Sequence, residues 1–185
     1  MHIYRRIQTD LGDFWIACSP CGVTAVHPAA GGPAAFEEKY RKRFGLRPGP
    51  GDVPAAWRRA LQTAASGRPP RDVPVDWSIF TGFQEKVLRR LLEVPRGQVR
   101  TYAWLARRAG NPRAARAVGN ALARNPIPLL LPCHRIVPAS GGLGNYGLGS
   151  RLKGELLLRE GADIAQGPPR PLRGPRGAGQ KVCVP

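Results

Sequence analysis

The chain is poor in acidic residues and has no long apolar run. Asp and Glu number 12 against 29 Lys and Arg, so the formal net charge is +17 at pH 7. No run approaches the roughly 20 apolar residues that a membrane-spanning helix needs. Residues 1–10 also lack the apolar segment of a secretory signal. We therefore predict a cytoplasmic protein that does not bind membranes.

Cysteine is scarce, with four residues in the chain. Without an export signal these thiols are expected to be reduced. Cys18 and Cys21 form a Cys-x-x-Cys pair, but a structural zinc would need two further ligands, and only His2 and His27 lie nearby in the sequence. We expect paired thiols at a strand turn and no metal site, although zinc at this pair stays open.

The positive charge is concentrated in the second half. The chain has 185 residues, which allows one large domain or two small ones, and 42% of them are hydrophobic, as in a folded protein. Residues 1–76 hold 11 basic and 7 acidic side chains, whereas residues 77–185 hold 18 and 5. This imbalance points to a polyanionic partner, with nucleic acid favoured, and places its contacts in the second half.

The first half has the pattern of a small α/β domain. Alternating β-formers predict strands over 2–8, 14–18 and 22–27, and residues 34–44 and 54–65 read as helices. The Pro-rich stretch 66–76 is the best linker. We therefore expect an N-terminal α/β domain over 1–76, with a small antiparallel sheet plus helices.

The second half reads as helices separated by short breaks, and we assign 77–163 to one mainly α domain. Apolar residues recur at helical spacing from Phe83 to Leu92, and Thr101 caps a second helix that begins with Tyr102. A third helix is expected over 112–124, with Pro112 at its first position. Two short helices joined by a tight Gly-containing turn indicate a helix-turn-helix. Residues 164–185 are rich in Gly, Pro and Arg, and we predict a disordered basic tail.

The third helix has one basic face. Four polar side chains fall within about 80° on a helical wheel, namely Arg113, Arg116, Asn120 and Arg124. Ala114, Val118, Ala121 and Leu122 lie on the other side. Such a face is often merely solvated, but its helix-turn-helix context favours binding to nucleic acid.

A Cys-His pair follows this helix. The Pro-containing segment 125–128 predicts an extended path, and the apolar triplet 129–131 should enter the core directly before Cys133 and His134. An unperturbed thiol is only about 3% ionised at pH 7, whereas an imidazole that takes the proton yields a thiolate nucleophile. Neighbours on a strand point to opposite faces, so this pair needs a turn or a bridging water.

A carboxylate on the last predicted helix completes a candidate relay. Residues 151–160 read as a helix that ends at Gly161, with Leu152, Leu156 and Leu157 on its buried face. Glu160 falls on that same face and needs a partner there. Lys153 and His134 are the two candidates, and a pairing with His134 would give a Cys-His-Glu relay.

The segment from Tyr102 to Glu160 resembles the C-terminal domain of the O6-alkylguanine-DNA alkyltransferases, also called methylated-DNA–protein-cysteine methyltransferases. The shared motifs are Arg116–Gly119, Asn125-Pro126, the PCHRIV sequence at 132–137, Ser140-Gly141, Asn145–Gly147, Lys153, Leu156-Leu157 and Glu160-Gly161. Residues 1–76 match only in length and order of elements. The resemblance implies a ribonuclease-H-like N-terminal domain followed by a winged-helix-like helix-turn-helix domain.

The resemblance also implies a stoichiometric repair reaction without a cofactor. Cys133 would take the alkyl group from O6-alkylguanine irreversibly, with His134 acting through a water as its base and Glu160 orienting His134. Asn125 would tie the turn before the cysteine strand, and Tyr102 would donate to the departing guanine. A thioether is very stable, so each molecule would act once. Alkyl-group size and activity on O4-alkylthymine stay open.

The implied partner is double-stranded DNA that contains the lesion, bound by a monomer. The helix-turn-helix would dock in the minor groove, Arg116 would enter the base stack, and the damaged base would flip into a pocket. The other helix residues expected at the DNA are Arg113, Ala115, Ala117, Gly119 and Asn120. The pocket would be formed by Ile136, Tyr146, Gly147 and Leu148, with Gly147 where some relatives carry serine.

Three other interpretations fit the sequence less well. The Gly-x-Gly-x-x-Gly match at 142–147 lacks the βαβ unit of a dinucleotide site, so we expect a pocket loop there. A DNA-binding regulator or an alkyltransferase-like damage sensor would do no transfer chemistry, but such sensors replace the reactive cysteine. An unrelated cysteine hydrolase is disfavoured by the basic helix-turn-helix and the missing oxyanion motif.

Overall fold

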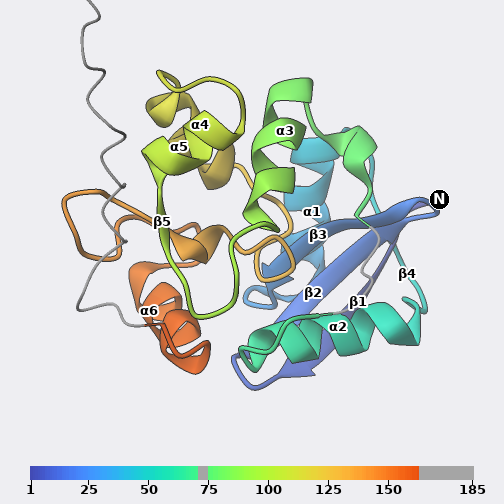
Figure 1. Ribbon diagram of the computed structural model, residues 1–185. Coiled ribbons are helices and arrows are strands. Elements are labelled where there is room, and N and C mark those ends of the chain that lie inside the picture. The colour runs from blue at the N-terminus through green and yellow to red at the C-terminus, as the bar shows by residue number, and fades with distance from the viewer. Residues whose placement is uncertain (71–74, 163–185) are drawn as a thin grey trace, which may run out of the picture.

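The N-terminal half forms a four-stranded sheet (Figure 1). The computed structural model describes residues 1–70 and 75–162. Strands β1 (Ile3–Thr9), β2 (Gly12–Ser19) and β3 (Gly22–Pro28) form an antiparallel meander, as the sequence predicts. The short strand β4 (Gly49–Pro50) pairs in parallel with the free edge of β1, so the sheet is mixed rather than purely antiparallel.

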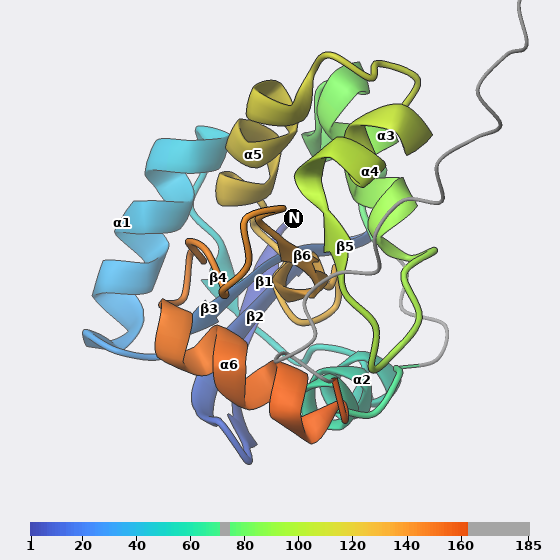
Figure 2. The same ribbon diagram turned by 60° about the vertical axis from the view of Figure 1, so that its left-hand side comes forward.

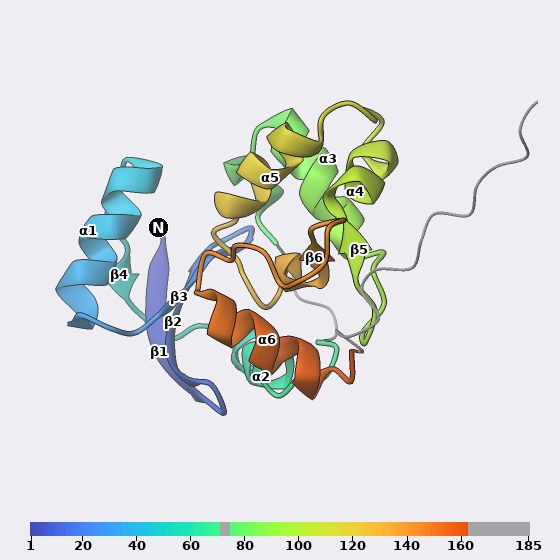
Figure 3. The same ribbon diagram turned by 90° about the vertical axis from the view of Figure 1, so that its left-hand side faces the viewer.

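Both faces of this sheet are covered, because successive side chains of β2 point in opposite directions. Trp15 packs under helix α1 (Gly32–Phe44) together with Phe36 and Tyr40. Phe14 and Ile16 join the main core, which also contains Leu61 of helix α2 (Ala55–Ala65). Figure 3 shows α1 on one side of the sheet and the other helices on the opposite side.

The predicted linker returns to the sheet at its end. Residues 71–74 lie outside the described part, but Val75 bridges to Val23 of β3. Asp76 is buried, accepts a hydrogen bond of 2.5 Å from Ser19 and caps the 3₁₀ turn Trp77–Ile79. The start of the second half is therefore anchored to the edge of the first.

The second half contains the three predicted helices of the helix-turn-helix region. Helix α3 (Gly82–Leu91) begins with a capping box formed by Thr81 and Gln84, and Leu92 is its exposed C-cap. In helix α4 (Tyr102–Arg108), the Thr101 hydroxyl accepts from the Trp104 amide, as predicted. Helix α5 (Ala115–Ala123) follows, and α4 packs against it.

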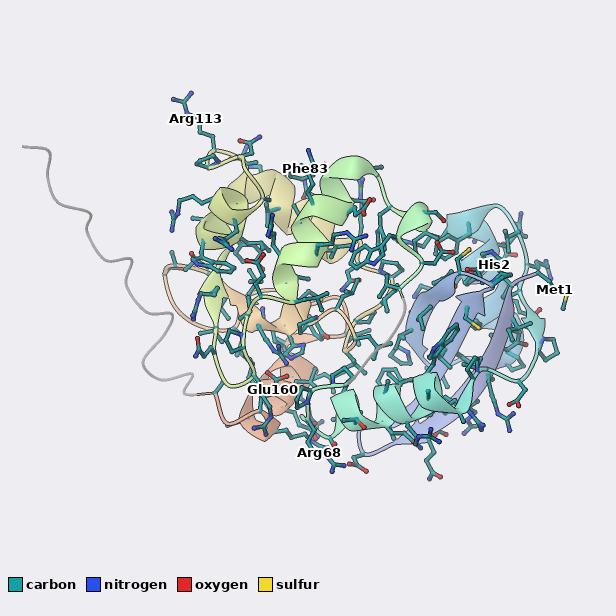
Figure 4. The ribbon with its side chains drawn as sticks, turned by 45° about the vertical axis from the view of Figure 1, so that its right-hand side comes forward. Met1, His2, Arg68, Phe83, Arg113 and Glu160 are labelled. Carbon is teal, nitrogen blue, oxygen red and sulfur yellow. The ribbon has the colours of Figure 1, made fainter. Side chains whose placement is uncertain are left out.

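The start of α5 corrects the sequence prediction. The Ala114 amide donates to the Asn111 carbonyl over 3.0 Å, so residues 111–114 form a separate turn and Ala114 becomes the N-cap. Pro112 is therefore not the first helical residue. Arg113 also precedes the helix, so it does not belong to the basic helical face that the sequence predicted. Figure 4 shows Arg113 projecting from the tip of the molecule.

The segment between α5 and Cys133 forms a turn, not the predicted extended path. The Leu131 amide donates to the Ile127 carbonyl over 2.9 Å, and Leu129 adopts a left-handed backbone with φ 71°. Such a backbone is costly for a leucine and persists here because all three leucines of 129–131 are buried. The apolar triplet thus enters the core as expected, but through a tight reversal.

The remaining elements frame this turn. Residues Cys133–Arg135 form a 3₁₀ turn, and β6 (Ile136–Val137) pairs in parallel with β5 (Arg100–Thr101). Helix α6 (Ser150–Arg159) has Glu160 as its C-cap, and Gly161 follows with a φ of 76°, the left-handed geometry expected just after a helix. The segment before α6, in orange, lies between α5 and α6 in Figure 2.

One buried cluster joins the two halves, since it contains Phe14 and Ile16 from the sheet and Leu88, Val118 and Leu131 from the second half. The predicted tail, 164–185, lies outside the described residues. Within the described part, no helix has the length and apolar character needed to cross a membrane.

Leu131→Ala tests the importance of the buried turn. Leu131 is fully buried, so we expect its truncation to lower the free energy of unfolding by about 2–5 kcal/mol, through lost apolar contacts and a residual cavity. Chemical denaturation measures this loss. Leu158→Ala is the matched control, because Leu158 is 70% exposed and its truncation should have little effect. Equal losses for both variants would contradict the placement of Leu131 in the core.

Candidate functional site

Cys133 lies at the start of the 3₁₀ turn and is buried. The Asn125 amide nitrogen donates to its Sγ over 3.2 Å and to the Leu131 carbonyl over 3.1 Å. The Asn125 oxygen accepts from the Ile127 amide. Asn125 therefore closes the turn that follows α5, the role that the resemblance implied. It also touches the sulfur, and this contact was not predicted.

His134 contacts Glu160 at the end of α6. Its Nε2 lies 3.0 Å from Glu160 Oε1, and both side chains are buried. Burial alone would raise the pKa of Glu160, but hydrogen bonds from His134 and Arg135 outweigh it and lower this pKa to about 2. Since an ionised carboxylate only accepts hydrogen bonds, Nε2 carries the proton.

The other ring nitrogen of His134 is therefore a free base. Burial, as the largest effect, lowers the pKa of His134, and the imidazole is neutral. With the proton on Nε2, Nδ1 presents a lone pair, and it has no hydrogen-bond partner among the described residues. A buried acceptor without a partner is costly, so this atom is poised to receive a proton.

Arg135 is a member of the site that the sequence analysis missed. Its Nε donates to Glu160 Oε2 over 2.9 Å and its terminal nitrogen to Oε1 over 2.8 Å. Another terminal nitrogen donates to the Val94 carbonyl. The 3₁₀ turn brings both His134 and Arg135 onto one carboxylate, and adjacency to His134 was the available signal. Lys153, the other partner considered for Glu160, instead donates to the Ile136 carbonyl over 2.6 Å.

The Cys133 thiol is not ionised at rest. Burial raises its pKa, while the Asn125 amide and the positive charge of Lys153 act in the opposite direction. Reaction at this sulfur therefore requires a group that removes its proton, and the Nδ1 lone pair of His134 is in the same turn.

Two cavities meet at Cys133. One, of about 370 Å³, is lined by Tyr102 of α4, Asn120 of α5, and Tyr146 and Gly147 of the loop before α6. The other, of about 200 Å³, includes Leu148, the α5 end and residues from the N-terminal half, among them His27, Phe36, Lys39, Tyr40 and Phe44. The cysteine is thus reached from the side of α5, although its own exposure is small.

The cavity walls carry two half-buried tyrosines, Tyr102 and Tyr146. The Tyr146 hydroxyl is buried, and no hydrogen-bond partner is found for it among the described residues. Tyr102 is half-buried and lies beside Gly119, where a Cβ would stand 3.9 Å from its ring. At Gly147 an added Cβ would meet nothing within 4 Å, so the wall is open there.

The other predicted residues are distributed unevenly. Arg116, Ala117 and Asn120 are exposed on α5, whereas Ala115 is half-buried. The Ile136 side chain is fully buried and lines neither cavity, so the structure does not bring this predicted pocket residue to the cavity wall. Figure 4 shows Glu160 well separated from Arg113 at the tip.

The Cys18 and Cys21 pair is divided by exposure, because Cys18 is buried and Cys21 exposed, and both are free thiols. Over residues 1–70 and 75–162, no three His, Cys, Asp or Glu side chains gather as metal ligands would.

Comparison with known proteins links this site to one family. Residues 82–162 match the family described as "6-O-methylguanine DNA methyltransferase, DNA binding domain". The methylated-DNA–protein-cysteine methyltransferase of Mycobacterium bovis is 48% identical over 158 residues, which cover 85% of this chain and 91% of that protein. The human protein of the same name is 52% identical over 80 residues, 43% of this chain and 39% of its own length.

Solved structures of the same family match the fold of this chain along most of its length. The Mycobacterium tuberculosis OGT in complex with DNA has a TM-score of 0.69 and 32% identity, and the match covers 90% of this chain and 96% of that one. Several curated relatives align over about half of their length or less, as the human protein does.

Glu160→Gln tests the buried carboxylate through pH. Because folding lowers the pKa of Glu160 from 4.5 to about 2, its ionised form stabilises the fold above pH 4.5, and this contribution is lost as the pH falls towards 2. We expect the variant to be less stable than wild type at neutral pH, with a difference that shrinks on acidification. Urea denaturation across this range measures it.

The matched control is Glu155→Gln, which breaks a surface ion pair with Arg159 on the same helix. Surface pairs contribute little, so its effect should be small at every pH. A Glu160→Gln difference that stays constant on acidification would contradict the buried ionised carboxylate.

Proposed function

This chain belongs to the methylated-DNA–protein-cysteine methyltransferase family, and we propose that it repairs DNA by transferring the alkyl group of O6-alkylguanine to its own Cys133. The observation that carries the proposal is the place of Cys133. It lines two cavities and shares a 3₁₀ turn with His134, whose Nδ1 has no hydrogen-bond partner among the described residues. The cavity on the α5 side suits a nucleotide base that has flipped out of the DNA double helix.

The first step removes the thiol proton. His134 Nδ1 takes it through a bridging water, and Glu160 keeps the ring oriented with its other nitrogen protonated. Arg135 holds Glu160 in turn through two hydrogen bonds. The carboxylate also stabilises the imidazolium that forms, so the relay supplies both orientation and charge compensation.

The second step is an SN2 displacement at the alkyl carbon. The sulfur lone pair forms the S–C bond as the C–O6 bond breaks, and its electron pair moves onto the guanine. Guanine leaves well only when that charge is stabilised by a donor. The Tyr102 hydroxyl, on the cavity wall, provides the donor, while backbone groups of Cys133 and Ile136 read the exocyclic amine. The product thioether is stable, so each molecule is consumed once.

The DNA contact rests on the exposed face of α5. Arg116, Ala117 and Asn120 are exposed there, and small residues allow a close approach to the minor groove. Arg116 replaces the damaged base in the stack, and the base swings into the cavity beside Tyr102, Tyr146 and Gly147. The DNA complex of the Mycobacterium tuberculosis protein supports this partner.

We also propose the fold of each half, the oligomeric state and the location of the protein. We infer a ribonuclease-H-like unit over 1–76 and a winged-helix-like unit over 77–163, acting as a cytoplasmic monomer without a cofactor. The small β5–β6 pair beside α4 supports the winged-helix description. A damage sensor or regulator without transfer chemistry is not favoured, because the cysteine that such sensors replace is present.

Incubation with an oligonucleotide that contains O6-methylguanine tests the transfer. We expect the peptide that bears Cys133 to gain one methylene in mass, with one protein molecule consumed per lesion. Mass spectrometry of the digested protein measures this gain. Cys133→Ala should bind the DNA without any gain, and Cys21→Ala, which removes an exposed thiol, should behave as wild type. An unchanged mass with folded wild-type protein would rule out the proposed function.

Arg116→Ala tests base flipping. Because flipping costs a few kcal/mol, loss of the inserted side chain should slow transfer by about tenfold or more. Affinity for undamaged DNA should fall only slightly, since a single charge is removed. Single-turnover transfer and binding titrations measure the two effects. Arg47→Ala, a charge removal at an exposed site in the N-terminal half, should leave transfer unchanged. Equal losses of binding and transfer for Arg116→Ala would contradict this role.

A further inference from the structure

A buried lysine lies in the site without a carboxylate partner. Lys153 of α6 is 1% exposed, and its Nζ donates to the Ile136 carbonyl over 2.6 Å. Among the described residues it forms no salt bridge, although eleven other cationic side chains do. None of the steps proposed for alkyl transfer to Cys133 uses Lys153.

An isolated buried ammonium is costly for the fold. Removing a cation from water carries a large desolvation penalty unless an anion compensates it. The buried carboxylate at the end of the same helix, Glu160, already binds His134 and Arg135 through its two oxygens. Burial lowers the pKa of Lys153 to about 8, and the charge of Cys133 acts to raise it. The described residues therefore supply no carboxylate for this ammonium in the resting protein.

Among the described titratable groups around Cys133, Lys153 is the one whose positive charge is not balanced by a carboxylate. Tyr102 from α4 and Tyr146 from the loop before α6 both have pKa values raised, first by burial, and are neutral. His134 from the same turn is neutral because burial lowers its pKa. The charge of Arg135 is balanced by Glu160. Lys153 donates to a carbonyl three residues after Cys133, in the continuation of the same turn.

We propose that Lys153 is a positioning residue whose buried positive charge stabilises the Cys133 thiolate between loss of the thiol proton and formation of the S–C bond. This inference rests on the proposed function, which supplies the step that needs a thiolate. In the resting protein the ammonium is bound by one backbone carbonyl. After proton transfer it faces a sulfur anion, and the pair is neutral.

The Ile136 carbonyl also links Lys153 to recognition of the guanine base. A carbonyl oxygen has two lone pairs, so the Ile136 oxygen can hold the ammonium and still accept from the exocyclic amine of guanine. Lys153 thereby fixes the acceptor that orients the base while its charge acts on the nucleophile. The hydrogen bond and the charge are separable by substitution, because glutamine retains a donor and methionine does not.

The test compares Lys153→Gln and Lys153→Met with Arg151→Met, which removes an exposed cation from the same helix. The Cys133 thiolate is titrated by its ultraviolet absorbance, taken as the difference from a matched Cys133→Ser protein, in the absence of DNA. We expect both Lys153 variants to move this titration upward by about 1 pH unit or more, as loss of a nearby opposite charge does. Arg151→Met should leave it in place.

Single-turnover transfer gives the second readout. At neutral pH, the rate of both Lys153 variants should fall by about tenfold for each pH unit by which the thiol titration moves upward, and it should recover as the pH rises. Thermal unfolding reports folding, and Lys153→Met should keep the melting temperature, because methionine is unbranched and removes a buried charge. If Lys153→Gln does not fold, Lys153→Met carries the test.

Two results would overturn the proposal. In the first, the thiolate titrates at the wild-type pH in folded Lys153→Met. In the second, Lys153→Gln restores the wild-type titration, which would assign the effect to the hydrogen bond. The titration needs no DNA, so it stands apart from the proposed function. Wild-type protein that gains no methylene would refute the transfer, whatever the titration shows.

Discussion

The carboxylate of Glu160 holds the site together by accepting from two consecutive side chains. His134 and Arg135 both point at it, from a single 3₁₀ turn, although they are separated from it by some 25 residues of chain. Without this anion, the buried guanidinium of Arg135 would keep only the Val94 carbonyl as a partner, and the imidazole would have no fixed tautomer. The end of α6 is therefore fixed relative to the nucleophile, and the loop that closes the cavity is held between them.

The N-terminal half acts on the same turn from the other side. The Val26 amide of β3 donates to the Pro126 carbonyl over 2.8 Å, and Arg43 of α1 donates to the Arg124 carbonyl over 2.6 Å. These bonds satisfy carbonyls just after α5, where a cation also complements the helix dipole. The sheet thus supports the segment between the DNA-facing helix and Cys133, which gives the first half a part in the site without supplying the reactive group.

Charge has two distinct uses in this protein. Arg116 on α5 is exposed, as are Arg113 before this helix and Arg124 at its C-cap. They add to a large positive excess in the chain, which suits non-specific attraction of a phosphate backbone. Inside the site the charges are few and individually placed: Glu160 with Arg135, and Lys153 near the sulfur. Because burial strengthens electrostatic interactions, each internal charge affects the thiol far more than any surface arginine does.

The three-stranded meander, the six helices and the Cys-His pair could be predicted from the sequence, because alternation, helical periodicity and turn residues are local signals. The short strands β4, β5 and β6 and the start of α5 were not predicted correctly. The register of Glu160 on the buried face of α6 was readable for the same reason. Tertiary structure alone decided that Arg135 shares Glu160, that Asn125 touches the sulfur, that the 125–131 segment reverses instead of extending, and that Lys153 is buried beside a carbonyl. These outcomes depend on distances between segments far apart in the chain, and no local pattern encodes which buried charge will find which partner.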